Sequence, residues 1–142
     1  MARLGIPVGI SDFEKIRKNG YYYVDKSGLI AELLEEKSTE VTLITRPRRF
    51  GKTLGMSMLA NFFDIRKEST ELFKGLEIAE QRDVCSEWMN QFPTLFVTFK
   101  DVDGLDFSSA YGMLSSTITE LYKEHLYLME SSRISPYDKE IM

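Results

Sequence analysis

A short apolar segment that leads into Gly51-Lys52-Thr53 constrains this chain more than any other feature. Residues 41–45 are apolar and β-branched, as in a strand, and residues 54–63 carry apolar side chains at helical spacing. A strand, a loop ending in Gly-Lys-Thr and a helix together form a phosphate-binding P-loop. In such a loop Gly51 allows close approach of a phosphate, Lys52 reaches the β- and γ-phosphates, and Thr53 ligates Mg²⁺.

The loop departs from the usual P-loop pattern at its first position. The pattern G-x-x-x-x-G-K-[ST] would begin at residue 46, which is Arg46, and Pro47 removes one amide donor. Two interpretations therefore stay open, a phosphate-binding loop and a basic turn in which Gly51 is an ordinary turn residue. The apolar segment before the loop and the helical pattern after it favour the phosphate-binding loop.

The charge balance argues against a broad nucleic-acid footprint. The 142 residues fit one domain, and their net charge is −4. Non-specific binding to nucleic acid usually requires a basic domain. The local basic patch of Arg46, Arg48, Arg49 and Lys52 is sufficient for a polyphosphate.

The cysteine content and the absence of long apolar segments predict a cytoplasmic protein. Cys85 is the one cysteine, so no intramolecular disulfide can form, and we interpret it as a packed or half-exposed thiol rather than a nucleophile. The N-terminal residues lack a signal-peptide core, and no apolar run reaches the roughly 20 residues that span a bilayer. We therefore expect no membrane partner.

Helices and strands alternate along the predicted chain, which indicates an α/β fold. The second predicted strand is the apolar run at residues 94–99, of the kind that is buried on both faces of a parallel sheet. Helices are predicted at residues 12–18, 29–37, 51–66, 71–75, 80–90 and 108–131. We expect an incomplete P-loop NTPase-type parallel sheet flanked by helices.

Several motifs, in order along nearly the whole chain, resemble the AAA-ATPase-like domain family of bacteria. The segments that carry the resemblance are Gly9–Ile16, Gly20–Ser27, Arg46–Leu54, Met58–Phe63, Leu72–Ile78 and Phe92–Asp103. An arginine-rich loop is typical of this family, so Arg46 at the first position is a family variant of the P-loop. Members often carry a PD-(D/E)XK nuclease-like region after the ATPase-like part.

The resemblance implies a site for ATP and Mg²⁺ at the loop. Gly51, Lys52 and Thr53 match the phosphate-binding positions, and Thr53 is the expected metal ligand. The site residues expected from the loop are Arg48, Arg49, Phe50, Gly51, Lys52 and Thr53. Of these, Arg48 or Arg49 could stabilise charge on the γ-phosphate.

The segment Tyr23–Lys26 also matches a family motif, which in related ATPases packs near the adenine. Two interpretations stay open here. The segment encloses the base or ribose of the nucleotide, or Asp25 caps the helix that follows it.

The resemblance further implies a later apolar strand that ends in acidic residues, the Walker B element. Residues 94–99 end beside Lys100 rather than a carboxylate, and we interpret Asp101 as a loop residue rather than the metal-side acid. Asp103 and Asp106 add acids without the spacing of a calcium loop. His125 is interpreted as a surface or boundary residue within a helix. We expect this chain alone to be inactive and hydrolysis to belong to the full-length protein.

We interpret residues 1–142 as the N-terminal portion of a P-loop domain. It comprises a helical arm (1–40), the strand, loop and helix (41–66) and a second strand with helices (67–142). Open sheet edges could be covered by another copy of the chain, and nucleic acid could be bound through a missing C-terminal region. The alternative function is a regulatory module whose basic loop binds nucleic acid or another polyanion without ATP hydrolysis.

Overall fold

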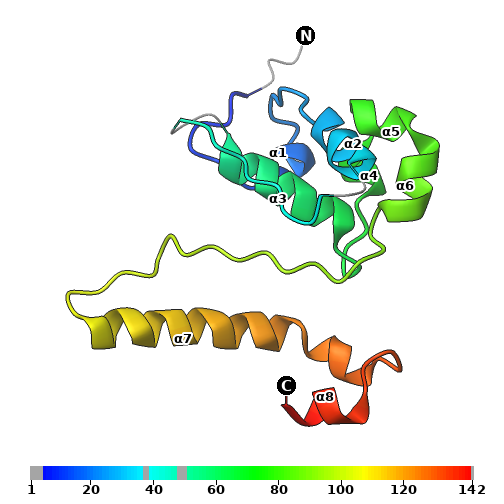
Figure 1. The fold of residues 1–142 in the computed structure, drawn as a ribbon. Coiled ribbons are helices and arrows are strands. Elements are labelled where there is room, and N and C mark those ends of the chain that lie inside the picture. The colour runs from blue at the N-terminus through cyan, green and yellow to red at the C-terminus, as the bar shows by residue number, and fades with distance from the viewer. Residues whose placement is uncertain (1–4, 37–38, 48–50, 142) are drawn as a thin grey trace. The chain divides into compact units, whose positions relative to one another are not determined.

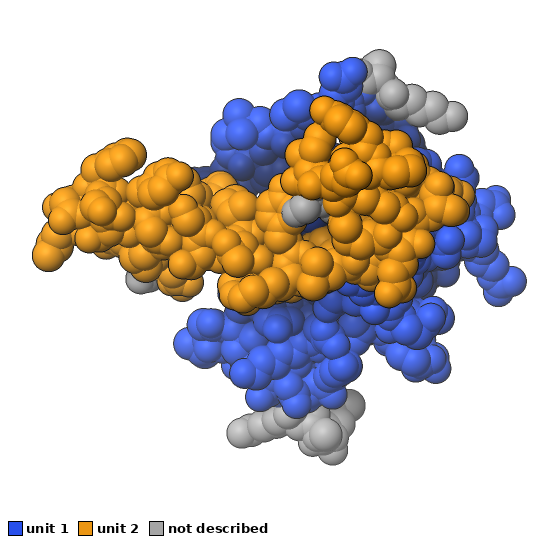
Figure 2. All heavy atoms as spheres, turned by 90° about the horizontal axis from the view of Figure 1, so that it is seen from below, with its two compact units in different colours: residues 1–96 blue, residues 97–142 orange. Residues whose placement is uncertain are grey.

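The computed structural model describes residues 5–36, 39–47 and 51–141, and it divides the chain into two compact units. Unit 1 is residues 1–96 and unit 2 is residues 97–142, blue and orange in Figure 2. The helices of unit 1 are α1 (Phe13–Lys18), α2 (Gly28–Glu35), α3 (Lys52–Phe63), α4 (Thr70–Phe73), α5 (Glu77–Glu80) and α6 (Arg82–Trp88) (Figure 1). Those of unit 2 are α7 (Phe107–Glu124), the 3₁₀ helix η1 (Leu126–Glu130) and α8 (Pro136–Ile141).

The expected α/β fold with a parallel sheet is wrong. Helices account for 53% of the described residues, and none of these residues lies in a strand. Residues 41–45 and 94–99 carry no regular structure, and Val41 and Leu43 are each 84% exposed. A strand requires backbone hydrogen bonds to a neighbouring strand. No such neighbour lies beside either segment in the part of the chain that the structure describes, so their apolar content alone does not make a sheet.

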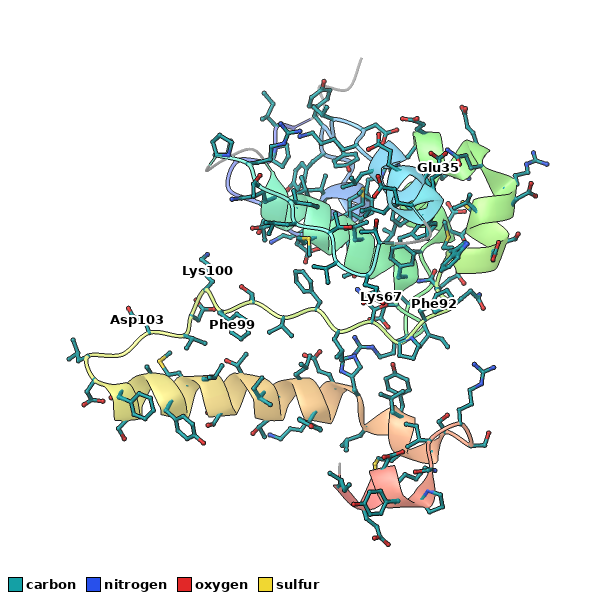
Figure 3. All side chains as sticks on the ribbon, viewed as in Figure 1. Glu35, Lys67, Phe92, Phe99, Lys100 and Asp103 are labelled. Atoms are coloured by element: carbon teal, nitrogen blue, oxygen red, sulfur yellow. The ribbon has the colours of Figure 1, made fainter. Side chains whose placement is uncertain are left out.

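The segment at residues 94–99 ends at a turn that begins with Lys100. Phe99 and Lys100 project to opposite sides of the chain (Figure 3). Backbone pairing within the described ranges is limited to one isolated parallel bridge between Asp64 and Phe92. We expected a second copy of the chain to cover open sheet edges. Since the described residues form no sheet, that argument for a homo-oligomer no longer applies.

Helix α1 begins at Phe13, one residue after the predicted start at residue 12. Asp12 is the N-cap, and its side chain accepts a hydrogen bond from the amide of Lys15 at 3.1 Å. The helix buries Phe13 and Ile16, and the amide of Phe13 donates to Ser57 Oγ of α3 at 3.0 Å. This bond fixes the start of α1 on the middle of α3.

Aromatic side chains form the centre of the core of unit 1. Phe13, Phe62 and Phe73 are fully buried, with ring centroids 4.9 Å apart for Phe13–Phe73 and 5.3 Å for Phe62–Phe73. Burying each such side chain stabilises the fold by roughly 1.5–3 kcal/mol. The core thereby joins α1, α3 and α4.

Helix α3 ends at Phe63, earlier than the predicted residue 66, because backbone amides of residues 90 and 92 donate hydrogen bonds to the carbonyl groups of its last two residues. The backbone amide of Asn90 donates to the carbonyl of Phe62 at 2.7 Å, and the backbone amide of Phe92 donates to the carbonyl of Phe63 at 3.0 Å. Asn90 has a positive φ of 56°, which asparagine tolerates better than most residues. Its side-chain amide also donates to the carbonyl of Asn61 at 3.1 Å.

Unit 2 is built on the long helix α7, which begins one residue before the predicted residue 108 and ends at Glu124, seven residues before the predicted residue 131. Asp106 caps it by accepting a hydrogen bond from the amide of Ser109 at 2.8 Å. None of the residues of α7, η1 and α8 is buried. His125, between α7 and η1, is 4% exposed, so its interpretation as a surface or boundary residue is wrong.

Candidate functional site

Gly51 forms the turn that starts α3. Its backbone has φ 76° and ψ 23°, a left-handed conformation that glycine adopts readily and other residues rarely do. Lys52 and Thr53 follow as the first two residues of the helix. The chain thus joins these three predicted site residues at one helix N-terminus. The other three, Arg48, Arg49 and Phe50, lie outside the described residues.

Among the described residues, no side chain caps the N-terminus of α3. Gly51 offers no side chain to cap it, and its first turn holds no acidic residue. In contrast, Asp12 and Asp106 cap α1 and α7. Unpaired amides and the positive end of the helix dipole favour negative charge at such a terminus.

The side chains of Lys52 and Thr53 are exposed and available for a ligand. Within the described ranges, neither side chain makes a hydrogen bond or an ion pair. A lysine ammonium and a threonine hydroxyl at the start of a helix can contact a phosphate and its metal ion, respectively.

Three hollows of unit 1 meet at Gly51. The first, of about 400 Å³, and the second, of about 420 Å³, are both mainly apolar. The second is called the basic hollow because Lys26, Arg46 and Lys52 line it. The third, of about 790 Å³, lies between residues 8–11 and residues 51–54. The first is lined by Ile6, Pro7, Ile10, Ile16, Tyr22, Tyr23, Val24, Lys26, Gly51, Leu54 and Gly55. The second is lined by Lys26, Leu29, Ile44, Arg46, Gly51, Lys52, Gly55 and Met58. Gly55, which sequence reasoning did not single out, faces both of these hollows.

Tyr23 takes part in the core as well as in the wall of the apolar hollow. Its hydroxyl donates to the sulfur of Met58 at 3.2 Å, and its ring meets that of Phe13 edge-on at 5.3 Å. Burial raises the pKa of Tyr23, so the phenol stays protonated at neutral pH.

Asp25 connects two helices. Its carboxylate accepts hydrogen bonds from the amide of Ser27 at 2.8 Å and from the amide of Glu77 at 2.7 Å. Burial opposes ionisation, but the hydrogen bonds from Ser27 and Glu77 outweigh it and lower the pKa of Asp25. Ser27 is the N-cap of α2, and no described side chain caps that helix, so Asp25 does not cap the helix that follows it. Its second hydrogen bond is to the first residue of α5, which ties the residues before α2 to the start of α5.

Lys26 is a site residue that the sequence did not assign to the phosphates. A Cβ atom on Gly51 would lie 3.9 Å from its ammonium nitrogen. The family motif at Gly20–Ser27 contained Lys26, but local spacing carries no sign that it returns to residue 51. This proximity depends on the packing of α2 against the rest of unit 1.

Other residues considered from the sequence have local structural roles. Asp103 accepts a hydrogen bond from the amide of Gly104 at 2.7 Å, and the thiol of Cys85 donates to the carbonyl of Ile78 at 3.2 Å. Burial raises the pKa of Cys85, which opposes a nucleophilic role. His125 Nδ1 lies 2.9 Å from the carbonyl oxygen of Leu121, so this nitrogen carries a proton.

The described residues contain no group of three or more His, Cys, Asp or Glu side chains arranged to hold a metal ion. Across residues 5–36, 39–47 and 51–141, no helix combines the length and the apolar character needed to cross a membrane.

Comparison with known proteins gives a family match along most of the chain. The family described as "Predicted AAA-ATPase" matches residues 7–141. A protein of Azotobacter chroococcum mcd 1, described as an uncharacterized protein in the vnfD 5′ region, is 38% identical over 100 residues. That match covers 70% of this chain but 18% of the relative, so the chain spans less than a fifth of the relative's length. No solved structure matches.

Proposed function

The chain belongs to the predicted AAA-ATPase family, and on this premise we propose that it binds ATP with Mg²⁺ at the N-terminus of α3. The observation that carries the proposal is the left-handed Gly51 directly before Lys52 and Thr53, at a helix start that no described side chain caps. Membership of this family is consistent with nucleotide binding in general. The geometry supports a phosphate at this helix end.

The roles of the residues follow from their chemistry. Lys52 offers an ammonium to the β- and γ-phosphates, and Thr53 offers its hydroxyl to Mg²⁺. The amides of the first turn of α3 add hydrogen bonds to phosphate oxygens. Arg48 and Arg49, which precede this turn in the sequence, would stabilise charge on the γ-phosphate, with the amide of Phe50 completing the loop.

The apolar hollow beside Gly51 suits the adenine base. Apolar and aromatic walls with few polar groups are typical of ligand pockets. Tyr22, Tyr23 and Val24 form one wall, and Ile6 and Ile10 are further lining residues. This assignment keeps the interpretation in which the segment after Gly20 encloses the base.

We propose nucleotide binding for this chain and assign hydrolysis to the full-length protein. Among the described residues, no Asp or Glu lines any of the three hollows at Gly51. Hydrolysis requires a carboxylate that orients water and supports the metal. ATPase activity would therefore depend on acids other than the residues that line these hollows.

Binding of a fluorescent ATP analogue with and without Mg²⁺ tests the proposal. We expect Lys52→Ala to weaken binding roughly ten- to a hundredfold, since hydrogen bonds to charged groups contribute about 1.5–3 kcal/mol. Lys74→Ala is the matched control, because the Lys74 side chain is 75% exposed and lies outside the three hollows. Binding by Lys52→Ala as tight as that of the wild type would refute the proposal.

The alternative function, binding of nucleic acid or another polyanion, is favoured by the exposure of Arg46 and Lys52 on the basic hollow. Titration with DNA across a salt series separates the two functions. A polyanion site loses affinity steeply with salt and does not require Mg²⁺. A nucleotide site binds ATP more tightly when Mg²⁺ is present.

A further inference from the structure

We propose that Lys26 is a second phosphate-binding lysine of this site, which contacts the polyphosphate of the nucleotide beside Lys52. The inference rests on the proposed nucleotide function and adds to it a residue from a different part of the chain. Lys26 immediately precedes α2 and its N-cap Ser27, whereas Lys52 opens α3.

The position of its ammonium is the first argument. Lys26 Nζ lies 3.9 Å from the point that a Cβ on Gly51 would occupy. A phosphate held at the start of α3 must approach Gly51, because that residue has no side chain to obstruct it. The Lys26 ammonium therefore reaches the same space as the phosphate.

The second argument is where Lys26 lies relative to the hollows. It lines both the apolar hollow and the basic hollow, which share Gly51 and Gly55. The basic hollow also contains Arg46 and Lys52. A nucleotide with its base in the apolar hollow and its phosphates in the basic one would pass Lys26.

The third argument is that hydrogen bonds hold the backbone on both sides of Lys26 in place. Asp25 accepts a hydrogen bond from the Glu77 amide at 2.7 Å, and the buried Ser27 hydroxyl accepts one from the Ile78 amide at 3.1 Å. The residues on both sides of Lys26 are thus hydrogen-bonded to the backbone of α5. A side chain on a fixed backbone loses less entropy when it binds a ligand.

The charge of Lys26 is also unused by the protein. No described residue forms an ion pair or a hydrogen bond with its ammonium. Glu32, Glu35 and Glu77 line another hollow with Lys26, yet none forms an ion pair with it. An ammonium in this position is free to pair with a phosphate, to which charge-assisted hydrogen bonds are strong.

A contact with phosphate predicts an effect that depends on the number of phosphates. We expect Lys26→Gln to weaken binding of ATP about tenfold, the size of one hydrogen bond to a charged group. The loss should be smaller for ADP, and binding of adenosine should change by less than about twofold, because adenosine has no charge to lose. Lys26→Arg keeps the charge and should retain most of the affinity for ATP.

The experiment is calorimetric titration of the full chain with ATP, ADP and adenosine in the presence of Mg²⁺. The variants are Lys26→Gln, Lys26→Arg and Lys52→Ala, with Lys74→Gln as the matched control lysine. Thermal melting of each variant without ligand shows that the fold is kept, since Lys26 is exposed.

The outcomes separate this inference from the proposed function. Selective loss of ATP affinity in Lys26→Gln, with rescue by Lys26→Arg, supports the role of Lys26. Unchanged ATP affinity, or an equal loss for adenosine and ATP, overturns it while leaving the role of Lys52 intact. Failure of the wild type to bind ATP, or unchanged ATP binding by Lys52→Ala, overturns the proposed function and this inference with it.

Discussion

Units 1 and 2 use the same kind of helix in different ways. In unit 1, α1, α3 and α4 bury Phe13, Phe62 and Phe73 completely. In unit 2, α7 has apolar residues at helical spacing, but Phe107 is 83% exposed and Tyr122 is 51% exposed.

The contrast shows that an apolar stripe predicts a helix but not its burial. The spacing of apolar residues in α7 is a local property of the sequence, and the N-cap at Asp106 adds a local hydrogen bond. Burial depends on a partner surface elsewhere in the chain. Most helical stability in proteins comes from such packing, so unit 1 should unfold cooperatively and α7 should contribute little to that transition.

The largest expected effect comes from removing a buried ring of unit 1. Phe62→Ala should lower the free energy of unfolding by about 3–5 kcal/mol, because it leaves a cavity between α3 and α4. Phe107→Ala in α7 should change it by less than about 0.5 kcal/mol, as is usual for exposed sites. Denaturation with urea, followed by tryptophan fluorescence from Trp88 of unit 1, measures both.

Equal losses from the two substitutions would break the comparison. They would mean that Phe107 packs as firmly in solution as Phe62 does. Hydrogen exchange provides an independent check, since amides of α3 should be protected close to the global free energy and those of α7 much less.

Local patterns in the sequence predicted most of the helices, and long-range contacts explain the failures. The apolar spacing identified α1 and α3 to within three residues and the start of α7 to within one, whereas α7 ends seven residues before the predicted residue 131. The sheet was predicted from two apolar segments, 41–45 and 94–99, but a ladder needs partner strands that local sequence cannot supply. The early end of α3 depends on Asn90, which is distant in sequence.

The same division applies to the candidate site. Gly51, Lys52 and Thr53 are consecutive, so a motif could identify them, and their binding role stays a prediction. Lys26 and Gly55 line the site through tertiary packing and helix geometry. Gly55 lies one helical turn after Gly51, a spacing that places both on one face of the helix start. That spacing was a signal that could have been used.

An effect of intermediate size on the free energy of unfolding is expected at two mid-helix glycines, Gly55 of α3 and Gly112 of α7. An added Cβ would meet no other atom within 4 Å at either position. Alanine is favoured over glycine in helices by about 0.5–1 kcal/mol. Gly55→Ala should therefore raise the free energy of unfolding of unit 1 by that amount. Gly112→Ala should raise the helical circular dichroism signal without raising that free energy.

The same pair of positions separates stability from ligand binding. Gly55→Leu places a branched side chain into the two hollows that Gly55 lines and should weaken binding of the ATP analogue. Gly112→Leu is the matched control and should leave binding unchanged. Equal binding by the two leucine variants would exclude Gly55 from the ligand site.

The smallest expected effect concerns the ion pairs of the two units. In unit 1, Glu14 of α1 contacts Lys18 at 2.5 Å and Lys67, beyond the end of α3, at 2.9 Å. In unit 2, Glu120 and Lys123 pair within α7 at 2.7 Å. Hydrogen bonds from Lys18 and Lys67 lower the pKa of Glu14 from 4.5 to about 2. Glu14 therefore connects two elements, whereas the pair in α7 is local.

Because the folded-state pKa of Glu14 is lowered, its contribution is complete above its unfolded value of 4.5 and is lost as the pH falls toward about 2. Partial exposure limits that contribution to less than about 1 kcal/mol. We expect Glu14→Gln to lower the free energy of unfolding at pH 7 and to approach the wild type near pH 2. Glu120→Gln, the control in α7, should leave the free energy of unfolding of unit 1 unchanged at every pH. A difference between Glu14→Gln and the wild type that stays constant across this range would show that the charge of Glu14 does not link α1 to Lys67.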